Sequence, residues 1–376
     1  MRRILFITCQ LNGGGAERVL LDILHHFDYK RYEVTLCQII PGGTLADEVP
    51  TEVKRISVWK GYTLGYKLAY RISNWLGMDY FLRRKLKSAI KDKYDLVISF
   101  LEGMPLKMHA ILNPNAINVS WVHCDLLRDP YEAKQFRHGE EIYAYNKMDK
   151  IICVSSSAKV AFIQRFSNVQ TPIDVIYNPI DTEKILSLAS KEDITYDKFT
   201  IVTVGRLCEQ KCMDRIIRLA SKFKSKEHSD IQFLIIGDGN LRKDLEKMAQ
   251  ELNVNDMVKF MGFMRNPFPY VKRANLFLSC SGFEGFSLVI CEAMCLGIPV
   301  ISTRTAGPIE ILENNKYGVL CNHDDSSIFD AVKQMIDEPD LREHYAKQAL
   351  IRAKSFNPKD TITAIEKLIY FNDEND

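Results

Sequence analysis

Short apolar runs alternate along the chain with longer segments in which apolar residues recur every three to four positions. Runs rich in Val and Ile are typical of strands buried in a parallel sheet, and the longer segments predict helices that cover it. The first series of predicted strands comprises RILFIT, YEVTLCQII, DLVISF, NVSWV, KIICVS and DVIYN. The second series comprises FTIVTVG, QFLIIGDG, VKFMGF, NLFLSC, PVISTR and YGVLC.

Two such series predict two α/β domains, each a doubly wound, Rossmann-like sheet with helices on both faces. The chain of 376 residues is long enough for both. The break is expected where Asn178-Pro179 ends a strand, because this dipeptide favours a turn. We therefore expect domains at residues 1–178 and 179–358. The segment 359–376 predicts a last helix, for which packing back on the first domain is one option.

Composition narrows the class of protein. Hydrophobic residues make up 46% and charged residues 26%, as in an ordinary globular protein, and the net charge of +2 gives no overall field for nucleic acid. The ten cysteines are scattered without zinc-site spacing, which favours reduced thiols and no metal. The N-terminal apolar run is too short for a signal peptide, and no run approaches a transmembrane span, so a cytoplasmic protein is expected.

One segment departs from this even composition. Residues 54–93 contain eleven Lys and Arg against two Asp, a net charge of +9 within a chain whose total is +2. The stretches YKLAYRISNWL and YFLRRKLKSAI mix these cations with aromatic residues and Leu, which is typical of a helix lying on an anionic membrane surface. A solvated helix face is the alternative.

A glycine-rich turn follows the first predicted strand and opens a helix, in the stretch GGGAERV. Glycines let the backbone approach a ligand, and a helix N-terminus offers free N–H groups to an anion. The turn lacks the G-x-G-x-x-G pattern, and no acidic residue closes the next strand to hold a nicotinamide cofactor's ribose, which disfavours a Rossmann dehydrogenase. A plain tight turn, with Glu17 as a first-turn helix charge, remains the alternative.

Two cations follow the strand FTIVTVG, in the stretch VGRLCEQK. Arg206 and Lys211 are expected at the carboxyl edge of the sheet, where open α/β sheets bind ligands. An arginine and a lysine there suit a diphosphate, although a solvated loop is the alternative. Further along, IIGDGN and FMGF predict turns after strands, with Asp238 as a cap for the following helix and the second turn as backbone available to a base.

Two glutamates, Glu284 and Glu292, lie in an apolar segment that has no Lys or Arg from Ser281 to Val300. A buried carboxylate without a partner costs several kcal/mol, so a partner from outside this segment is expected. Sugar hydroxyls can donate to such carboxylates, and an arginine from elsewhere in the fold is the alternative. The helix is expected to begin near Ser287, which leaves N–H groups free for a phosphate.

Taken together, GGGAERV, GRLCEQK, GDGNLRKDLE, FMGF and EGFSLVICE occur in the order and spacing found in family 4 glycosyltransferases. The chain resembles this family over nearly its whole length, and most closely the bacterial members that build surface polysaccharides or lipid-linked oligosaccharides. The resemblance implies the GT-B fold, in which two Rossmann-like domains face each other across a cleft, with the acceptor bound by the first domain and the nucleotide-sugar by the second.

The resemblance also implies roles for individual residues. Arg206 and Lys211 would hold the donor diphosphate and stabilise the leaving nucleoside diphosphate. Glu284 would bind hydroxyls of the transferred sugar, and Glu292 those of the ribose. The remaining donor contacts would come from the backbone around Phe263 and Met264 at the base, from Gly285, Phe286, Ser287 and Leu288 at the phosphates and sugar, and from Gly14 and Gly15 at the diphosphate.

His123, in SWVHCD, matches the histidine that the family places beside the reacting sugar, although a lone histidine is more often structural. In one departure, Cys212 follows the motif lysine where many members have Gly. The chain has no D-x-D triad, so metal-independent chemistry without a cofactor is expected.

The expected function is therefore a retaining, metal-independent transfer of a sugar from a nucleotide-sugar, with UDP as the expected nucleotide, to a saccharide acceptor. A polyprenyl-diphosphate-linked acceptor and peripheral association with the inner face of the cell membrane through residues 54–93 would fit the basic segment. The alternatives are a nucleotide-sugar-binding protein without transferase activity, and a GT-B epimerase or phosphorylase.

Overall fold

The computed structural model describes residues 1–128, 134–226 and 230–370. The chain forms two compact units, of which the first comprises Met1–Pro179 with Pro358–Asp376 and the second comprises Ile180–Asn357. The chain therefore passes between the units twice. Helix α15 (Pro358–Leu368) belongs to the first unit, where the Thr361 hydroxyl donates to the backbone oxygen of Tyr177 at 3.0 Å. Residues 371–376 of the predicted last segment lie outside the described residues.

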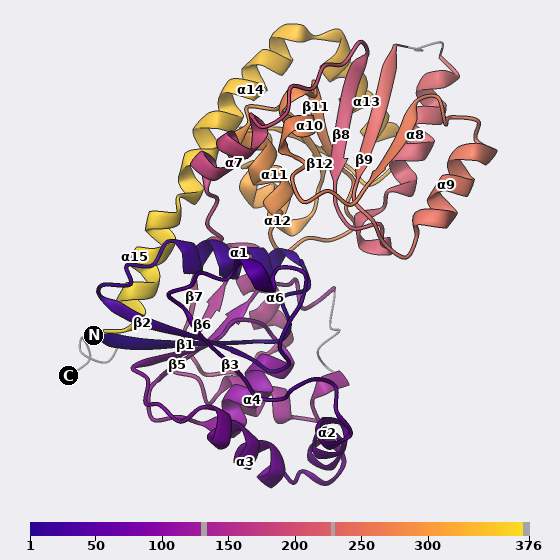
Figure 1. Ribbon diagram of the computed structural model, residues 1–376. Helices are drawn as coiled ribbons and strands as arrows, with labels where there is room; N and C mark the ends of the chain where they lie inside the picture. The colour runs from indigo at the N-terminus through magenta and orange to yellow at the C-terminus, as the bar shows by residue number, and fades with distance from the viewer. Residues whose placement is uncertain (129–133, 227–229, 371–376) are drawn as a thin grey trace. The chain divides into compact units, whose positions relative to one another are not determined.

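The first unit contains a seven-stranded parallel sheet of order β3-β2-β1-β4-β5-β6-β7 (Figure 1). Strand order reverses between β1 and β4, so the loops after these two strands leave the sheet side by side. The strands are β1 (Arg2–Thr8), β2 (Tyr32–Gln38), β3 (Lys54–Ser57), β4 (Leu96–Ser99), β5 (Ile117–Val122), β6 (Lys150–Cys153) and β7 (Ile173–Val175).

Helices cover both faces of this sheet because side chains alternate along each strand. Leu5 and Ile7 of β1 belong to a buried cluster with side chains of α2, α3 and α4, whereas Phe6 between them packs edge-on against Phe27 beyond α1. The other helices of the unit are α1 (Gly15–His25), η1 (Ala46–Glu48), α2 (Leu64–Leu76), α3 (Tyr80–Ala89), α4 (Met104–Leu112), α5 (Glu140–Tyr145) and α6 (Ser156–Arg165).

The second unit contains a six-stranded parallel sheet of order β10-β9-β8-β11-β12-β13, which reverses between β8 and β11. Figure 1 shows α8, α9 and α13 on one side of this sheet and α7, α10, α11 and α14 on the other. The strands are β8 (Phe199–Val204), β9 (Ile231–Ile236), β10 (Val258–Gly262), β11 (Leu276–Ser279), β12 (Val300–Thr303) and β13 (Val319–Cys321). The helices are α7 (Thr182–Ala189), η3 (Glu209–Lys211), α8 (Asp214–Lys224), α9 (Arg242–Glu251), α10 (Phe268–Arg273), α11 (Leu288–Cys295), α12 (Ala306–Ile311), α13 (Asp325–Asp337), α14 (Pro339–Ala353) and η4 (Lys354–Phe356).

The α/β class with two doubly wound sheets is confirmed, and each of the twelve predicted strands overlaps a strand of the structure. The edge strand β3 was missed. Its sequence KRIS has two cations, and three of its four residues are exposed, so it carries little of the hydrophobic pattern from which strands are predicted. Within the described residues, no helix is both long and apolar enough to cross a lipid bilayer.

Candidate active site

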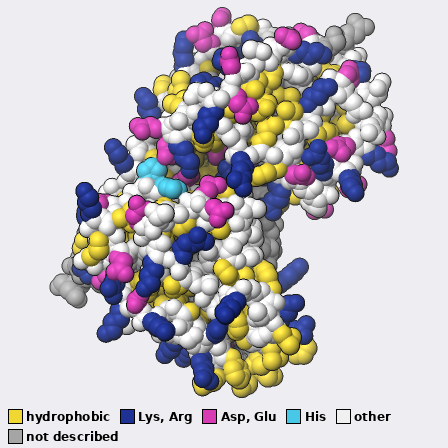
Figure 2. Space-filling view, viewed as in Figure 1, with side chains coloured by type: hydrophobic (Ala, Val, Ile, Leu, Met, Phe, Trp, Pro, Cys, Tyr) yellow, Lys and Arg dark blue, Asp and Glu magenta, His cyan; other side chains and the backbone are white. Residues whose placement is uncertain are grey.

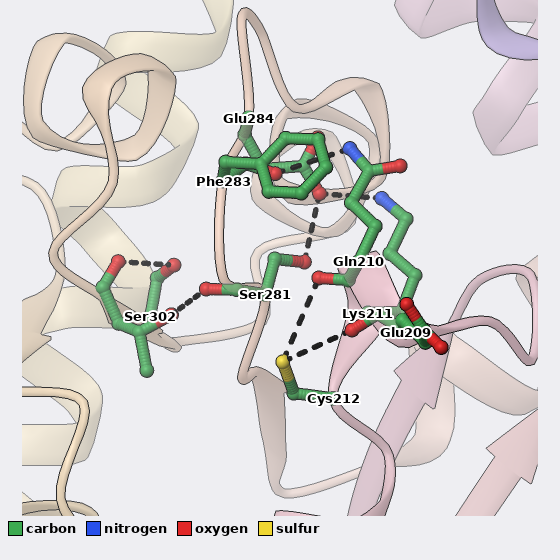
Figure 3. Close-up of polar contacts among 9 residues, drawn as sticks. Glu209, Gln210, Lys211, Cys212, Ser281, Phe283, Glu284 and Ser302 are labelled. Carbon is green, nitrogen blue, oxygen red and sulfur yellow. Dashed lines mark hydrogen bonds and ion pairs between the residues drawn. The ribbon is translucent and has the colours of Figure 1, made fainter. Parts of the chain in front are cut away.

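In the second unit, the loops that follow β8 and β11 meet at the point where strand order reverses. The β8 loop carries Lys211 at the end of η3, and the β11 loop carries Glu284. The Lys211 ammonium donates to Oε1 of Glu284, and the Ser281 hydroxyl donates to the same oxygen at 2.8 Å (Figure 3). The structure thus brings together the predicted cation and one of the two predicted acids.

This ion pair is largely removed from water, because the Lys211 and Glu284 side chains are 19% and 6% exposed. Burying two charges carries a desolvation cost that their attraction offsets only with good geometry and further hydrogen bonds, such as that from Ser281. Without a ligand, Lys211 and Glu284 neutralise each other. A sugar hydroxyl can replace Lys211 as a donor to Glu284, and a phosphate oxygen can replace Glu284 as an acceptor for Lys211.

Hydrogen bonds to backbone groups fix the loops after β8 and β11. The Gln210 side chain donates to the Phe283 carbonyl at 3.1 Å, and the Gly282 N–H donates to the Gln210 carbonyl at 2.8 Å. Gly307 at the start of α12 donates its N–H to the Glu284 carbonyl at 3.0 Å, and a Cβ added at Gly307 would lie 2.9 Å from Cα of Phe286. Sequence reasoning missed Gln210 and Gly307, since the contacts of each lie in a distant loop.

Arg206 is the second residue after β8, and its side chain is exposed. Among the residues that the structure describes, the Arg206 guanidinium has no hydrogen-bond or ion-pair partner. The guanidinium is therefore available to an anionic ligand, whereas the Lys211 ammonium must first separate from the Glu284 carboxylate.

Two glycines in the loop after β9 lie close to the backbone of the loop that carries Arg206. Gly237 has φ +145°, and a Cβ added there would lie 1.9 Å from the Gly205 oxygen; one at Gly239 would lie 2.3 Å from the Leu207 oxygen. The prediction that Asp238 caps the following helix is wrong. Its carboxylate accepts the Gly239 N–H at 2.8 Å and pairs with Arg242 at 3.3 Å, whereas α9 has no side-chain cap.

The predicted start of the helix near Ser287 is correct, because α11 begins at Leu288 with Ser287 as its N-cap. Gly285, Phe286 and Ser287 are buried and lead into the helix. The Ser287 hydroxyl is buried, does not cap the helix and has no hydrogen-bond partner in the described parts of the chain. Glu292 lies one turn into α11 and is half-buried.

Phe263 and Met264 follow β10 at the same edge of the sheet. Gly262, the last residue of β10, has φ +74°, which turns the chain and leaves the Phe263 ring 59% exposed. The predicted contact of this segment with a base stays a prediction, for which the exposed aromatic ring supplies a stacking surface.

The residue that departs from the family pattern, Cys212, has φ +47° and ψ +47° at the end of η3. This left-handed conformation is the reason that glycine suits the position, since a side chain there costs about 1 kcal/mol. The Cys212 thiol donates to the Glu209 carbonyl at 3.2 Å, so the loop tolerates cysteine. All ten cysteines of the chain are free.

In the first unit, Gly14 is the N-cap of α1 and Gly15 its first residue, at the end of the loop that follows β1. Gly14 has φ −71°, which any residue adopts, and the left-handed residue of this turn is Gly13 with φ +94°. A Cβ at Gly14 would lie 2.2 Å from a side-chain oxygen of Glu17, so an added side chain would have to displace that carboxylate.

His123 follows β5 in the first unit and is half-buried, with its ring centroid 4.7 Å from that of Phe100. Burial lowers the pKa of His123 to about 3, so the imidazole is neutral at pH 7. Its Nε2 atom is buried and has no hydrogen-bond partner among the described residues. Sequence reasoning missed Glu102, whose carboxylate accepts the N–H groups of His123 and Cys124.

The paired doubly wound domains define the GT-B class of glycosyltransferases. The chain superimposes on Anabaena HepE, crystallised with UDP and glucose, with a TM-score of 0.78 at 20% identity, covering 98% of this chain and 99% of that one. The family models "Glycosyltransferase Family 4" and "Glycosyl transferases group 1" match residues 13–184 and 187–352. The chain belongs to this glycosyltransferase family, as the motifs predicted.

Two relatives from Campylobacter jejuni are named N-acetylgalactosaminyltransferases that act on undecaprenol diphosphate-linked saccharides. The first, a 4-α-N-acetylgalactosaminyltransferase, is 33% identical, and the match covers 57% of this chain and 58% of that relative's length. The second, an α-1,4-N-acetyl-D-galactosaminyltransferase, is 25% identical over 95% of both chains.

Proposed function

We propose that the protein transfers a sugar, of the N-acetylhexosamine or hexose class, from a UDP-sugar to a polyprenyl-diphosphate-linked saccharide. The observation that carries the proposal is the arrangement at the β8 and β11 loops, where Lys211 and Glu284 form a buried ion pair. The guanidinium of Arg206, in the same β8 loop, has no partner within the described parts of the chain. The names of the two Campylobacter relatives support the acceptor class, and the UDP in HepE supports the nucleotide.

Within this proposal, Arg206 and Lys211 bind the donor diphosphate, and Glu284 accepts hydrogen bonds from hydroxyls of the transferred sugar. Glu292 accepts those of the ribose, and the N–H groups at the start of α11 face the phosphates together with the Ser287 hydroxyl. The backbone around Phe263 and Met264 contacts the base. In the first unit, Gly14 and Gly15 are proposed to contact the diphosphate and His123 the reacting sugar.

The reaction we propose retains the configuration of the sugar and needs no metal. The bond from the anomeric carbon to the diphosphate oxygen breaks, the acceptor oxygen bonds to that carbon on the same face, and the acceptor proton passes to the departing phosphate. Arg206 and Lys211 stabilise the negative charge that develops on the phosphate. The α-linked products named for both Campylobacter relatives support retention, because the common UDP-hexoses are α-linked donors.

Measuring nucleotide binding and donor turnover tests the proposal. UDP and the correct UDP-sugar should raise the melting temperature in proportion to the logarithm of their concentration, and the protein should release UDP from the donor in the presence of a lipid-linked acceptor. A thermal shift without any UDP release would favour the alternative of a binding protein. Interconversion of the donor to an epimer, or dependence on free phosphate, would favour the epimerase or phosphorylase.

The acceptor side of the proposal includes an anionic membrane surface, for which α2 and α3 supply an exposed face. Figure 2 shows hydrophobic side chains gathered at this end of the first unit with Lys and Arg beside them. On α2, Leu64, Leu68 and Trp75 are exposed and lie on one helix face because they are four and seven residues apart. The exposed cations Lys67 and Arg71 lie next to them on that face.

We expect the purified protein to float with vesicles that contain anionic lipid and to remain unbound with neutral vesicles. Replacing Leu64 and Trp75, which are 82% and 86% exposed, with serine should weaken vesicle binding about tenfold or more, since two large apolar side chains no longer enter the interface. The matched control replaces Leu350 and Ile351, exposed on α14 of the second unit, with serine and should leave binding unchanged. Equal binding of both double variants would contradict a membrane role for α2.

A further inference from the structure

A buried carboxylate that belongs to none of the sequence motifs lies at the end of β4 in the first unit. Glu102 is 2% exposed, and its Oε1 atom accepts the backbone N–H groups of His123 at 2.5 Å and of Cys124 at 2.8 Å. These are the first two residues beyond β5, the parallel neighbour of β4. One side chain thus holds the backbone where the adjacent strand ends.

The segment that follows β4 also contacts the His123 ring. Phe100 directly follows β4, and its ring packs against the His123 ring with centroids 4.7 Å apart. Gly103, directly after Glu102, has φ +71° and turns the chain into α4. Glu102 therefore lies in the short connection between Phe100, which contacts the His123 ring, and the turn into α4.

A hydrogen bond from a backbone N–H to a carboxylate is stronger than one between neutral groups, and a buried N–H without a partner is destabilising. Two such N–H groups converge on one oxygen of Glu102, whereas its second oxygen, Oε2, is buried without a hydrogen-bond partner among the described residues. Burial raises the pKa of the Glu102 carboxyl. The contacts present require an acceptor atom at the Oε1 position and do not require a charge.

We propose that Glu102 is a positioning residue that sets the place of the His123 imidazole during sugar transfer, acting through the backbone of His123 and Cys124. The inference rests on the proposed function, because it takes His123 to be the group beside the reacting sugar. The Nε2 atom of His123, which is buried and has no partner among the residues described, is the atom whose position matters, since a ligand hydroxyl is a suitable partner for it. Misplacing a reacting group by about 1 Å can reduce the rate about a hundredfold.

Three substitutions separate acceptor geometry from charge. Glu102→Gln keeps an oxygen at the Oε1 position, Glu102→Asp keeps the charge but is too short to reach both N–H groups, and Glu102→Ala removes the acceptor. We expect Glu102→Gln to keep kcat within about threefold of the wild type, and the other two to lower kcat about ten- to a hundredfold. The Kd for UDP, measured by titration, should stay unchanged in all three, since the proposed nucleotide contacts of the second unit are intact.

A double-mutant cycle shows whether Glu102 acts through His123. In the His123→Ala background, Glu102→Ala should lower kcat by less than about threefold, because the ring it positions is already absent. Multiplicative effects would overturn the proposal, as would a Glu102→Gln variant as impaired as Glu102→Ala, which would assign the carboxylate a charged role on the substrate. An unchanged kcat with a lowered melting temperature in Glu102→Ala would leave only a structural role.

A readout that needs no activity keeps this inference distinct from the proposed function. The His123 ring resonances, followed by NMR of histidine-labelled protein, should move in Glu102→Asp and Glu102→Ala and remain in place in Glu102→Gln. Resonances that stay in place in all three variants would overturn the positioning role. A wild-type protein that consumes no donor while these resonances move as expected would refute the proposed function alone.

Discussion

Replacing Lys211 with methionine is expected to lower kcat by about a thousandfold. The change removes one of the two cations that we propose to stabilise the leaving diphosphate, and losing one such group in a buried site costs about a hundredfold to a thousandfold. It also leaves the Glu284 carboxylate buried with Ser281 as its one side-chain donor among the described residues, so the binding of the transferred sugar by Glu284 changes as well. Steady-state rates of UDP release with the purified variant measure the effect.

Lys224→Met provides a control in the same unit, because Lys224, the last residue of α8, pairs with the exposed Asp256 at 2.8 Å and donates to the Asn253 carbonyl at 2.6 Å. Exposed pairs of this kind contribute about 0–1 kcal/mol, so rate and melting temperature should stay near the wild type. Lys211→Arg should recover only part of the activity, since a planar guanidinium cannot occupy the position of the ammonium between Glu284 and its ligand. A Lys211→Met variant that retains more than a tenth of the wild-type kcat would remove Lys211 from the catalytic group.

The second large effect concerns stability. We expect Gly237→Ala to lower the free energy of unfolding by about 2–4 kcal/mol, because φ +145° is strained for any side chain and the new Cβ would lie 1.9 Å from the Gly205 oxygen. The backbone must shift to relieve this contact, and the shift displaces the loop that carries Arg206. Urea denaturation followed by the fluorescence of bound nucleotide analogue and by circular dichroism measures both consequences.

Gly61→Ala is the control for this prediction, since no atom lies within 4 Å of a Cβ built at Gly61 and its φ is not left-handed. It should change the unfolding free energy by less than about 0.5 kcal/mol. If Gly237→Ala unfolds at the wild-type urea concentration, the close approach of the β8 and β9 loops is not needed for stability.

The fold was predictable because parallel strands buried on both faces leave continuous runs of Val, Ile and Leu, as in FTIVTVG and NLFLSC. A second rule, that open α/β sheets bind ligands at the carboxyl ends of their strands, led to the prediction of Arg206 and Lys211 at that edge of the second sheet. Strand β3 escaped prediction because an exposed edge strand has no buried face to mark it.

Contacts within the site were less predictable, because they join residues that are distant in sequence. Lys211 and Glu284 are 73 residues apart, and nothing near either one indicates that they pair with each other before they meet a ligand. Glu102, in the stretch FLEGMP, has the local signature of an ordinary loop glutamate, and its two partners lie 21 and 22 residues further along. Only the register of β4 beside β5 brings them together.

The double passage of the chain between the units makes the second unit an insertion within the first, bounded at Ile180 and Asn357. A chimaera that exchanges sugar specificity between relatives should therefore transplant residues 180–357 as a cassette with two junctions. A single crossover near Pro179 would pair helix α15 of one parent with the sheet of another, and would replace matched contacts such as Thr361 with Tyr177 by untested ones.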